Sequence, residues 1–329
     1  MRELTYIQAV REAIQQEMRA DDKVFVVGQD IRGGVYPHTK DLVEEFGPDR
    51  IVDTPIAETG MFGTAFGAAL EGYRPIVDFM FGSCAFVNFN ESSTMAGQQY
   101  FMHGAKSPLP LVMTAAVGLG KRIGNDHAMF IHSTFARQPG IKVAMASTPY
   151  DAKGMFAAAI RDNNPVMIPW HTGVMQKRGH VPEEQYYIPL GVADVKREGS
   201  DVTVLANSEQ LYNALDVAEK LDGRISVEVI DPRSFVPFDL ECVLKSVAKT
   251  NRLIIIDEDW ESCGMASTIS ARVVEHGFDL LDAPIKRLCL PNIPIPGGYM
   301  EDYVRPTKES IEQAIFDICQ GTPILEACA

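Results

Sequence analysis

Glu58 stands where an apolar run gives way to a helix-like segment, and a carboxyl group in that place can perform acid–base chemistry. The run Ile51–Ile56 predicts a short buried strand, and Glu58–Glu71 predicts a helix. Small residues at 60, 63, 64 and 67 fall on one side of this helix, which would let another backbone approach closely. A first-turn carboxylate favoured by the helix dipole is the simpler explanation of an isolated Glu, so the surrounding sequence must decide.

His127 is the second candidate, because a histidine side chain can give or take a proton near neutral pH. It follows the glycine- and charge-containing stretch 118–126, which predicts a loop. A hydrogen-bonded loop histidine is the alternative interpretation. We expect His132, five residues further on, to be structural or solvent-exposed.

Short apolar runs alternate with helix-length segments along the chain, which predicts an α/β fold with a largely parallel sheet covered by helices. The first helix is marked by a capping box, Thr5 with Gln8, and by an apolar stripe that includes Ile7 and Met18. The predicted strands of the first half are Val24–Gly28, Ile51–Ile56, Pro75–Phe81, Pro110–Ala116, Ile141–Ala146 and Pro165–Trp170.

The alternation weakens after about Thr172 and resumes near Val202, which predicts two domains. We expect a first domain over residues 1–185, a linker with room for an edge strand over 186–200, and a smaller α/β domain over 201–329. The predicted helices of the second domain are Glu209–Leu221, Asp239–Lys249, Met265–His276 and Lys308–Cys319. Its predicted strands are Val202–Ala206, Ser226–Ile230, Leu253–Asp257 and Ile285–Leu290.

The composition excludes several classes of protein. The chain has 329 residues with 44 acidic and 30 basic side chains, a formal charge of −14, which argues against nucleic-acid binding. No apolar run approaches the length of a membrane span, and the start lacks the apolar core of a signal peptide. Six scattered cysteines without a paired spacing predict reduced thiols and a cytoplasmic protein.

Several segments, in this order, resemble the β subunit of the thiamine-diphosphate-dependent decarboxylating component of 2-oxo acid dehydrogenase complexes, in the transketolase-like superfamily: Asp53–Gly67, Gly72–Met80, His127, Pro139–Val143, Asp151–Gly154, Ala159–Val166, Val229–Arg233 and Thr250–Leu253. The family includes the pyruvate, branched-chain 2-oxo acid and acetoin dehydrogenases. The resemblance extends from about Thr5 to Cys319. It implies a pyrimidine-binding domain followed by a transketolase C-terminal-type domain.

The same resemblance assigns roles to individual residues. In this family a glutamate at the Glu58 position hydrogen-bonds the pyrimidine ring of the cofactor and promotes loss of the thiazolium proton. His127 matches a histidine that orients or protonates the substrate or the acyl group. Ile56, Met80 and Cys84 match positions beside the cofactor. The implied reaction is oxidative decarboxylation of a small 2-oxo acid with acyl transfer to a lipoyl group.

The resemblance also implies metals and partners. Leu111, Ala159, Ile160, Asp162 and Asn164 match positions that hold a potassium ion in several members, although Asp162–Asn164 also fits a simple helix-ending turn. The Gly-Asp-Gly signature for the magnesium that binds the diphosphate is absent from this chain. We therefore expect an α subunit to hold Mg²⁺ and the diphosphate, in an α₂β₂ assembly that serves a lipoyl acyltransferase core.

Three positions depart from the family pattern and keep other functions open. Gln29 stands where an acidic residue is usual, Cys84 where an aromatic ring is usual, and Ala128 where a serine is usual. The changes at 84 and 128 motivate thiamine-dependent acetoin cleavage, or a carboligase- or transketolase-type transfer, as alternatives. A diverged, non-catalytic scaffold subunit is a further alternative, against which the presence of both Glu58 and His127 argues.

Overall fold

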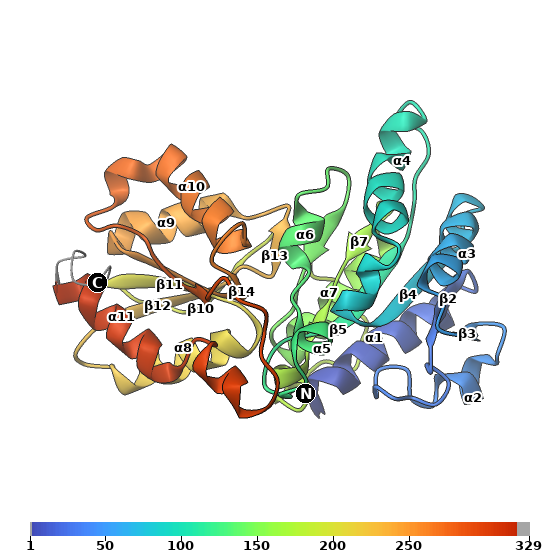
Figure 1. Ribbon diagram of the computed structural model, residues 1–329, viewed down its shortest axis with the longest axis horizontal. Helices are drawn as coiled ribbons and strands as arrows, with labels where there is room; N and C mark the ends of the chain where they lie inside the picture. Colours follow the sequence, from blue (N-terminus) through green and yellow to red (C-terminus); the bar gives the residue numbers. More distant parts are fainter. Residues whose placement is uncertain (1, 321–329) are drawn as a thin grey trace. The chain divides into compact units, whose positions relative to one another are not determined.

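A computed structural model describes residues 2–320 and divides the chain into two compact units. Unit 1 contains the residues up to Val192 together with two returning segments, Arg233–Pro237 and Ile295–Glu301. Unit 2 contains Ala193–Pro232, Phe238–Pro294 and the described residues from Asp302 onward. Both units are α/β, as the sequence predicts, and each is described by itself below (Figure 1).

The main sheet of unit 1 has the strand order β13-β6-β7-β5-β4-β2-β3, and β8 pairs with β5 beyond β7. Its neighbouring strands pair in parallel, except that β13 is antiparallel to β6. Its strands are β2 (Val24–Gln29), β3 (Ile51–Thr54), β4 (Arg74–Phe81), β5 (Val112–Val117), β6 (Lys142–Ala144), β7 (Val166–Met167), β8 (Trp170–His171) and β13 (Ser234–Val236). The confirmed parallel arrangement explains why these segments are apolar without alternation, since both faces are covered.

The helices of unit 1 follow local sequence signals. In α1 (Tyr6–Ala20), Thr5 and Gln8 form the predicted capping box, and the predicted apolar stripe is buried. Thr148 caps α7 (Pro149–Arg161), which packs against α1. The remaining helices are α2 (Leu42–Phe46), α3 (Glu58–Leu70), α4 (Ala96–Met102), α5 (Asn125–Ala128) and α6 (His132–Ala136), with one-turn 3₁₀ segments η1 (Gly82–Phe86) and η3 (Thr172–Val174), and π-helical η2 (Asn90–Met95).

Unit 2 is built around a five-stranded sheet of order β10-β12-β11-β14-β15, parallel except for β10. Helices α8 and α11 lie together below this sheet in Figure 1, and α9 and α10 lie together above it. Its strands are β10 (Asp194–Arg197), β11 (Val202–Ala206), β12 (Val227–Asp231), β14 (Leu253–Trp260) and β15 (Lys286–Leu290). Its helices are α8 (Ser208–Lys220), α9 (Leu240–Thr250), α10 (Met265–Gly277), η4 (Phe278–Leu280) and α11 (Lys308–Gln320); η5 (Gly298–Tyr303) joins the units.

Two details of the fold differ from the sequence-based expectation or extend it. The predicted strand Pro165–Trp170 is divided into β7 and β8 around Pro169, because proline has no N–H for a sheet ladder. Two short strands, β1 (Arg2–Thr5) and β9 (Arg178–Val181), form a separate antiparallel pair that the sequence did not indicate. No helix among the described residues could span a membrane. The five cysteines within the described range are free, and Cys328 lies outside it.

Candidate active site

The carboxyl edge of the unit 1 sheet contains the point where the chain reverses its direction of travel across the sheet. From β2 the chain proceeds to β3 on one side and then returns to β4 on the other side. Ligands of open parallel sheets bind at such a switch point, beyond the carboxyl ends of the strands. Gln29 ends β2, Glu58 follows β3, and Met80 lies near the end of β4. The fold therefore brings these three separated segments to one edge.

Glu58 begins α3, and its side chain is only 7% exposed. Within residues 2–320 no cationic side chain lies within ion-pair distance of its carboxyl group. A buried carboxylate without a cation is unfavourable unless hydrogen bonds or a ligand satisfy it. A surface carboxylate at a helix start, the simpler interpretation of the sequence, does not describe this residue.

Cys84 lies in η1, with its thiol close to the Glu58 carboxyl group. Burial, and after it the nearby Glu58 carboxylate, raises the pKa of the Cys84 thiol. The thiol therefore stays protonated and serves as a small, weakly polar neighbour of the carboxyl group. The structure thus brings together two of the residues that the sequence nominated for the cofactor site.

The third of those residues, Met80, has a left-handed backbone conformation with φ of +65°. For a residue other than glycine, such a conformation costs roughly 1–3 kcal/mol and persists where the surroundings enforce it. The N–H of Met80 donates to Oδ1 of Asp78 over 2.9 Å, and the sheet register is interrupted between Asp78 and Phe81. The end of β4 is therefore a sharp corner. Gly28, on the neighbouring strand β2, packs against this corner. A larger residue would not fit there, since a Cβ at position 28 would lie 2.8 Å from the Asp78 carbonyl oxygen.

Phe81, which the sequence analysis did not nominate, supplies an aromatic ring at this corner. Its ring meets the exposed His127 ring edge-on, with 4.3 Å between centroids, and the Tyr36 ring at 5.9 Å. Phe86, the aromatic residue two positions after Cys84, packs against Phe89 instead. Phe81 could have been found from its place at the end of a predicted strand. Its contact with His127 could not, since the two are far apart in sequence.

The loop that precedes His127 is braced by the returning segment Ile295–Glu301 of unit 1. The fully buried Glu301 carboxylate accepts the backbone N–H groups of Gly120 and Arg122. Gly298 N donates to the Arg122 carbonyl over 3.0 Å, and Ile123 forms a bridge with Gly297. Glu301 therefore supports this loop, and no motif or spacing in the sequence predicted that role.

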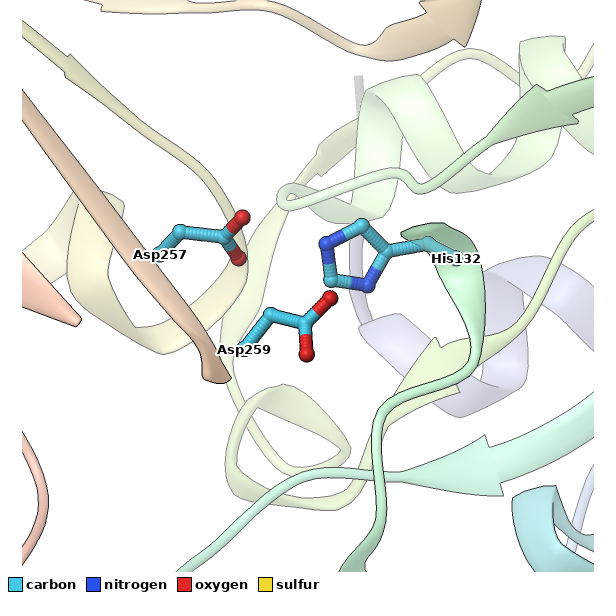
Figure 2. A group of neighbouring side chains, drawn as sticks. All are labelled: His132, Asp257 and Asp259. Atoms are coloured by element: carbon cyan, nitrogen blue, oxygen red, sulfur yellow. The ribbon is translucent and has the colours of Figure 1, made fainter. Parts of the chain in front are cut away.

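His132 and Ala128 are structural. His132, drawn in Figure 2, begins α6, is completely buried and stacks on Phe235 with centroids 4.6 Å apart. The structural alternative for His132 is therefore correct and the solvent-exposed one is wrong. Ala128 is also buried, and its carbonyl accepts the Gly118 N–H.

Ile56 and Gln29 occupy opposite environments near Glu58. Ile56 precedes α3 and is 81% exposed, so it presents an apolar side chain outward. Gln29 is buried, and within the described part of the chain its Nε2 has no hydrogen-bond partner. Asp30, next to it, is exposed and has a positive φ.

The residues matched to a potassium site lie around the end of α7 and beside β5. The Arg74 guanidinium donates to the carbonyls of Ile160 and Asp162, over 3.0 and 3.1 Å. The Leu111 and Ala159 carbonyls accept the N–H groups of Val166 and Asp162. The Asn164 side chain donates to the Asp162 carboxylate. The positive charge of Arg74 thus already binds two of the carbonyl oxygens that match the potassium site. The alternative interpretation, a helix-ending turn at Asp162–Asn164, also describes this segment.

Comparisons with known proteins support the arrangement at the level of family. The family described as the transketolase pyrimidine-binding domain matches residues 2–176, and the transketolase C-terminal domain matches residues 191–311. A split-gene transketolase, described as an inactive β4 tetramer, has the same fold: the TM-score is 0.79 at 19% identity, over 96% of this chain and 98% of that one.

Three relatives span nearly the whole chain. The β subunit of acetoin:2,6-dichlorophenolindophenol oxidoreductase from Bacillus subtilis (strain 168) is 40% identical, over 96% of this chain and 97% of its own. The 2-oxoisovalerate dehydrogenase β subunit from the same organism is 37% identical, over 96% and 99%. The β subunit of the pyruvate dehydrogenase E1 component from Gracilaria tenuistipitata var. liui is 38% identical, over 97% and 100%.

Proposed function

Because the chain belongs to the family of β subunits of thiamine-diphosphate-dependent 2-oxo acid dehydrogenases, we propose that it contributes the pyrimidine side of an active site that decarboxylates a small 2-oxo acid. The observation that carries the proposal is the buried Glu58 carboxyl group, which has no cationic partner in residues 2–320 and lies at the sheet's switch point. A basic ring nitrogen would satisfy that carboxyl group.

Each residue then has a definable task. Glu58 holds a proton on a carboxyl oxygen and shares it with the ring nitrogen of the bound cofactor. The Cys84 thiol fills the space beside Glu58 and reduces the access of water to it. His127, held edge-on by Phe81, offers its ring nitrogens to the substrate. Thiamine diphosphate, when bound, supplies the electron sink for decarboxylation.

An α subunit is part of the proposal, because the chain lacks the signature for the magnesium that binds the diphosphate. Unit 1 exposes large apolar side chains that suit a protein partner, including Ile56, Val87, Phe101 and Met102, all more than 60% exposed. On α3, a Cβ at Gly63 or Gly67 would meet nothing within 4 Å, so this face leaves room for a close neighbour. We propose an α₂β₂ assembly that transfers its acyl group to a lipoyl acyltransferase core.

The finer parts of the proposal concern the cation and the compartment. A potassium ion at the end of α7 would share the Ile160 and Asp162 carbonyls with Arg74, and each carbonyl has a second lone pair for it. Replacing potassium by choline should then lower the melting temperature.

The free cysteines of the described range suit the reducing cytoplasm, where we place the protein.

Acetoin is the second candidate substrate, since the relative from Bacillus subtilis that acts on acetoin is 40% identical to this chain. The test is to purify the chain with and without an α subunit from the same organism, and to titrate each sample with thiamine diphosphate and Mg²⁺ by calorimetry. Binding only in the paired sample is the expected result. Dye reduction with pyruvate, branched-chain 2-oxo acids and acetoin then identifies the substrate. Absence of binding in the paired sample would overturn the proposal.

A further inference from the structure

The corner at the end of β4 lies close to both candidate catalytic residues, Glu58 and His127. Cys84, in the segment that follows this corner, lies close to Glu58, and the Phe81 ring contacts His127. The backbone direction of this segment is set at Met80, the left-handed residue. Whatever fixes Met80 therefore fixes the positions of both contacts.

Asp78 joins Met80 to a histidine from a distant loop. Its Oδ1 accepts the Met80 N–H over 2.9 Å, and its Oδ2 lies 2.8 Å from Nε2 of His38. Asp78 is 4% exposed and His38 is 1% exposed, so this pair is shielded from water. With both oxygens engaged, the carboxylate cannot rotate without losing one of the two bonds.

His38 is itself held firmly by aromatic rings. Its ring centroid lies 5.5 Å from that of Trp170 and 6.5 Å from that of Tyr36, and the rings of Tyr36 and Trp170 meet edge-on at 4.7 Å. Tyr36 in turn touches Phe81. The first part of this loop is anchored by the Ile31 N–H, which donates to Asp53, and by the Arg32 guanidinium, which donates to the Ile51 and Pro48 carbonyls. Around His38 the backbone hydrogen bonds are long, 3.4 Å at Thr39 and at Lys40.

We propose that His38 is a positioning residue: through Asp78 it holds Met80 in the left-handed conformation that places Cys84 against Glu58 and Phe81 against His127. The inference rests on the proposed function for its catalytic meaning. The mechanical part, in which His38 fixes Asp78 and Asp78 fixes Met80, stands on the contacts alone.

Two substitutions separate the hydrogen bond from the volume of the side chain. His38→Leu fills the space but removes the donor to Asp78, whereas His38→Gln keeps an N–H donor of similar reach. Thr114→Val is the matched control: Thr114 lies opposite Asp78 on β5, and the change removes its buried hydrogen bond to the Ile168 carbonyl while it leaves both Asp78 oxygens engaged. If His38→Leu does not fold, Asp78→Asn, which keeps an acceptor for Met80, takes its place.

The first readout is amide hydrogen exchange in the peptide Asp78–Cys84, which needs no cofactor. We expect His38→Leu to accelerate exchange at Met80 at least about 10-fold, His38→Gln to restore most of the protection, and Thr114→Val to leave it unchanged. Unaltered protection in His38→Leu would overturn the inference. So would equal loss in the Leu and Gln variants, because the donor would then be irrelevant.

The second readout is thiamine diphosphate affinity of the chain paired with its α subunit. We expect His38→Leu to weaken binding about 10-fold, with His38→Gln and Thr114→Val close to the natural chain. If the natural pair binds no cofactor, the proposed function fails, while the exchange experiment still decides the role of His38. If the natural pair binds and His38→Leu binds equally well, the inference about the site fails and the proposed function survives.

Discussion

Strand β4 of unit 1 and strand β14 of unit 2 are built alike and end differently. Each has eight residues, lies inside its sheet and loses regular register near its carboxyl end. Each also ends beside an aspartate that accepts a backbone N–H: Asp78 from Met80 over 2.9 Å, and Asp259 from Trp260 over 2.7 Å. The shared feature is a carboxylate that stabilises an irregular strand end.

The two ends differ in what surrounds the carboxylate. Asp78 is paired with His38, and the pair fixes a corner. At β14 three successive acidic residues, Asp257, Glu258 and Asp259, are buried, and the Gln210 amide donates to Glu258. Figure 2 shows Asp257 and Asp259 on the same side of β14, as alternation along a strand requires. The end of β4 is therefore a fixed corner beside the candidate site, whereas the end of β14 is a cluster of buried acidic side chains.

The largest expected effect is on catalysis: a substitution at the candidate site of unit 1 should abolish it, whereas one at the acidic end of β14 should not. Glu58→Gln should fold normally but lower activity about 1,000-fold, because the amide cannot share a proton with the cofactor ring. Hydrogen–deuterium exchange at the reactive carbon of the cofactor measures this directly, and it should be lost. Glu258→Gln is the control in unit 2 and should leave that exchange intact. Normal exchange in Glu58→Gln would remove Glu58 from the mechanism.

Cysteine labelling compares the two charge environments. Burial, and after it Asp257, raises the pKa of Cys289 on β15 to about 12, while Cys263 is exposed. Because only the thiolate reacts, Cys289 should be alkylated by iodoacetamide on the order of 100-fold more slowly than Cys263. Peptide mass spectrometry over time follows both. Cys84 should also react slowly and gain further protection when the cofactor binds. Equal rates for Cys289 and Cys263 would contradict the raised pKa of Cys289.

Stability provides the third contrast. Asp78→Ala leaves His38 buried without its partner and should cost about 3 kcal/mol. Asp239→Ala in unit 2 removes a carboxylate that caps α9, by accepting the Cys242 N–H, and should cost about 1 kcal/mol. Trp170 lies in unit 1 and Trp260 in unit 2, so the fluorescence of each reports on the unfolding of its own unit. Replacing one tryptophan by phenylalanine leaves a single reporter, and urea denaturation then gives the free-energy cost in that unit. Equal losses would mean that the His38 pair adds nothing beyond ordinary capping.

The smallest effect concerns alkaline pH. Burial, and after it the Asp78 charge, raises the pKa of Tyr36 to about 12. Because the pKa is raised in the folded state, the neutral phenol contributes stability that is complete below about pH 10 and is lost as the pH rises through 12. Asp78→Asn should lower this pKa, as ultraviolet difference absorbance would show. An unchanged titration would place the Asp78 charge away from Tyr36.

Local signals in the sequence predicted most of the regular structure. The Thr5–Gln8 capping box began α1 as expected, and apolar runs identified the long strands of both sheets. The separate pair β1–β9 was missed, because each of these strands has only four residues, too few to show an alternation of apolar and polar positions. The antiparallel return of β13 to β6 was missed for the same reason.

The candidate site was only partly predictable. Glu58 was nominated by the family resemblance of the segment around it, since its place between a strand and a helix fits an ordinary first-turn carboxylate as well; its burial depends on tertiary packing. The pair His38–Asp78 joins residues 40 positions apart, from a loop and a strand, and no spacing rule connects them. The sequence therefore nominated the carboxyl group of the candidate site, but not the residues packed around it.

The discontinuity of unit 1 limits how this chain can be cut or recombined. A fragment that stops at Val192 would lack Ser234–Val236 and would expose the edge of β6, a ready template for aggregation. It would also lose Glu301, and with it the anchor of the loop before His127. An exchange of the second unit with that of another protein can therefore succeed only if both return segments are grafted with the first.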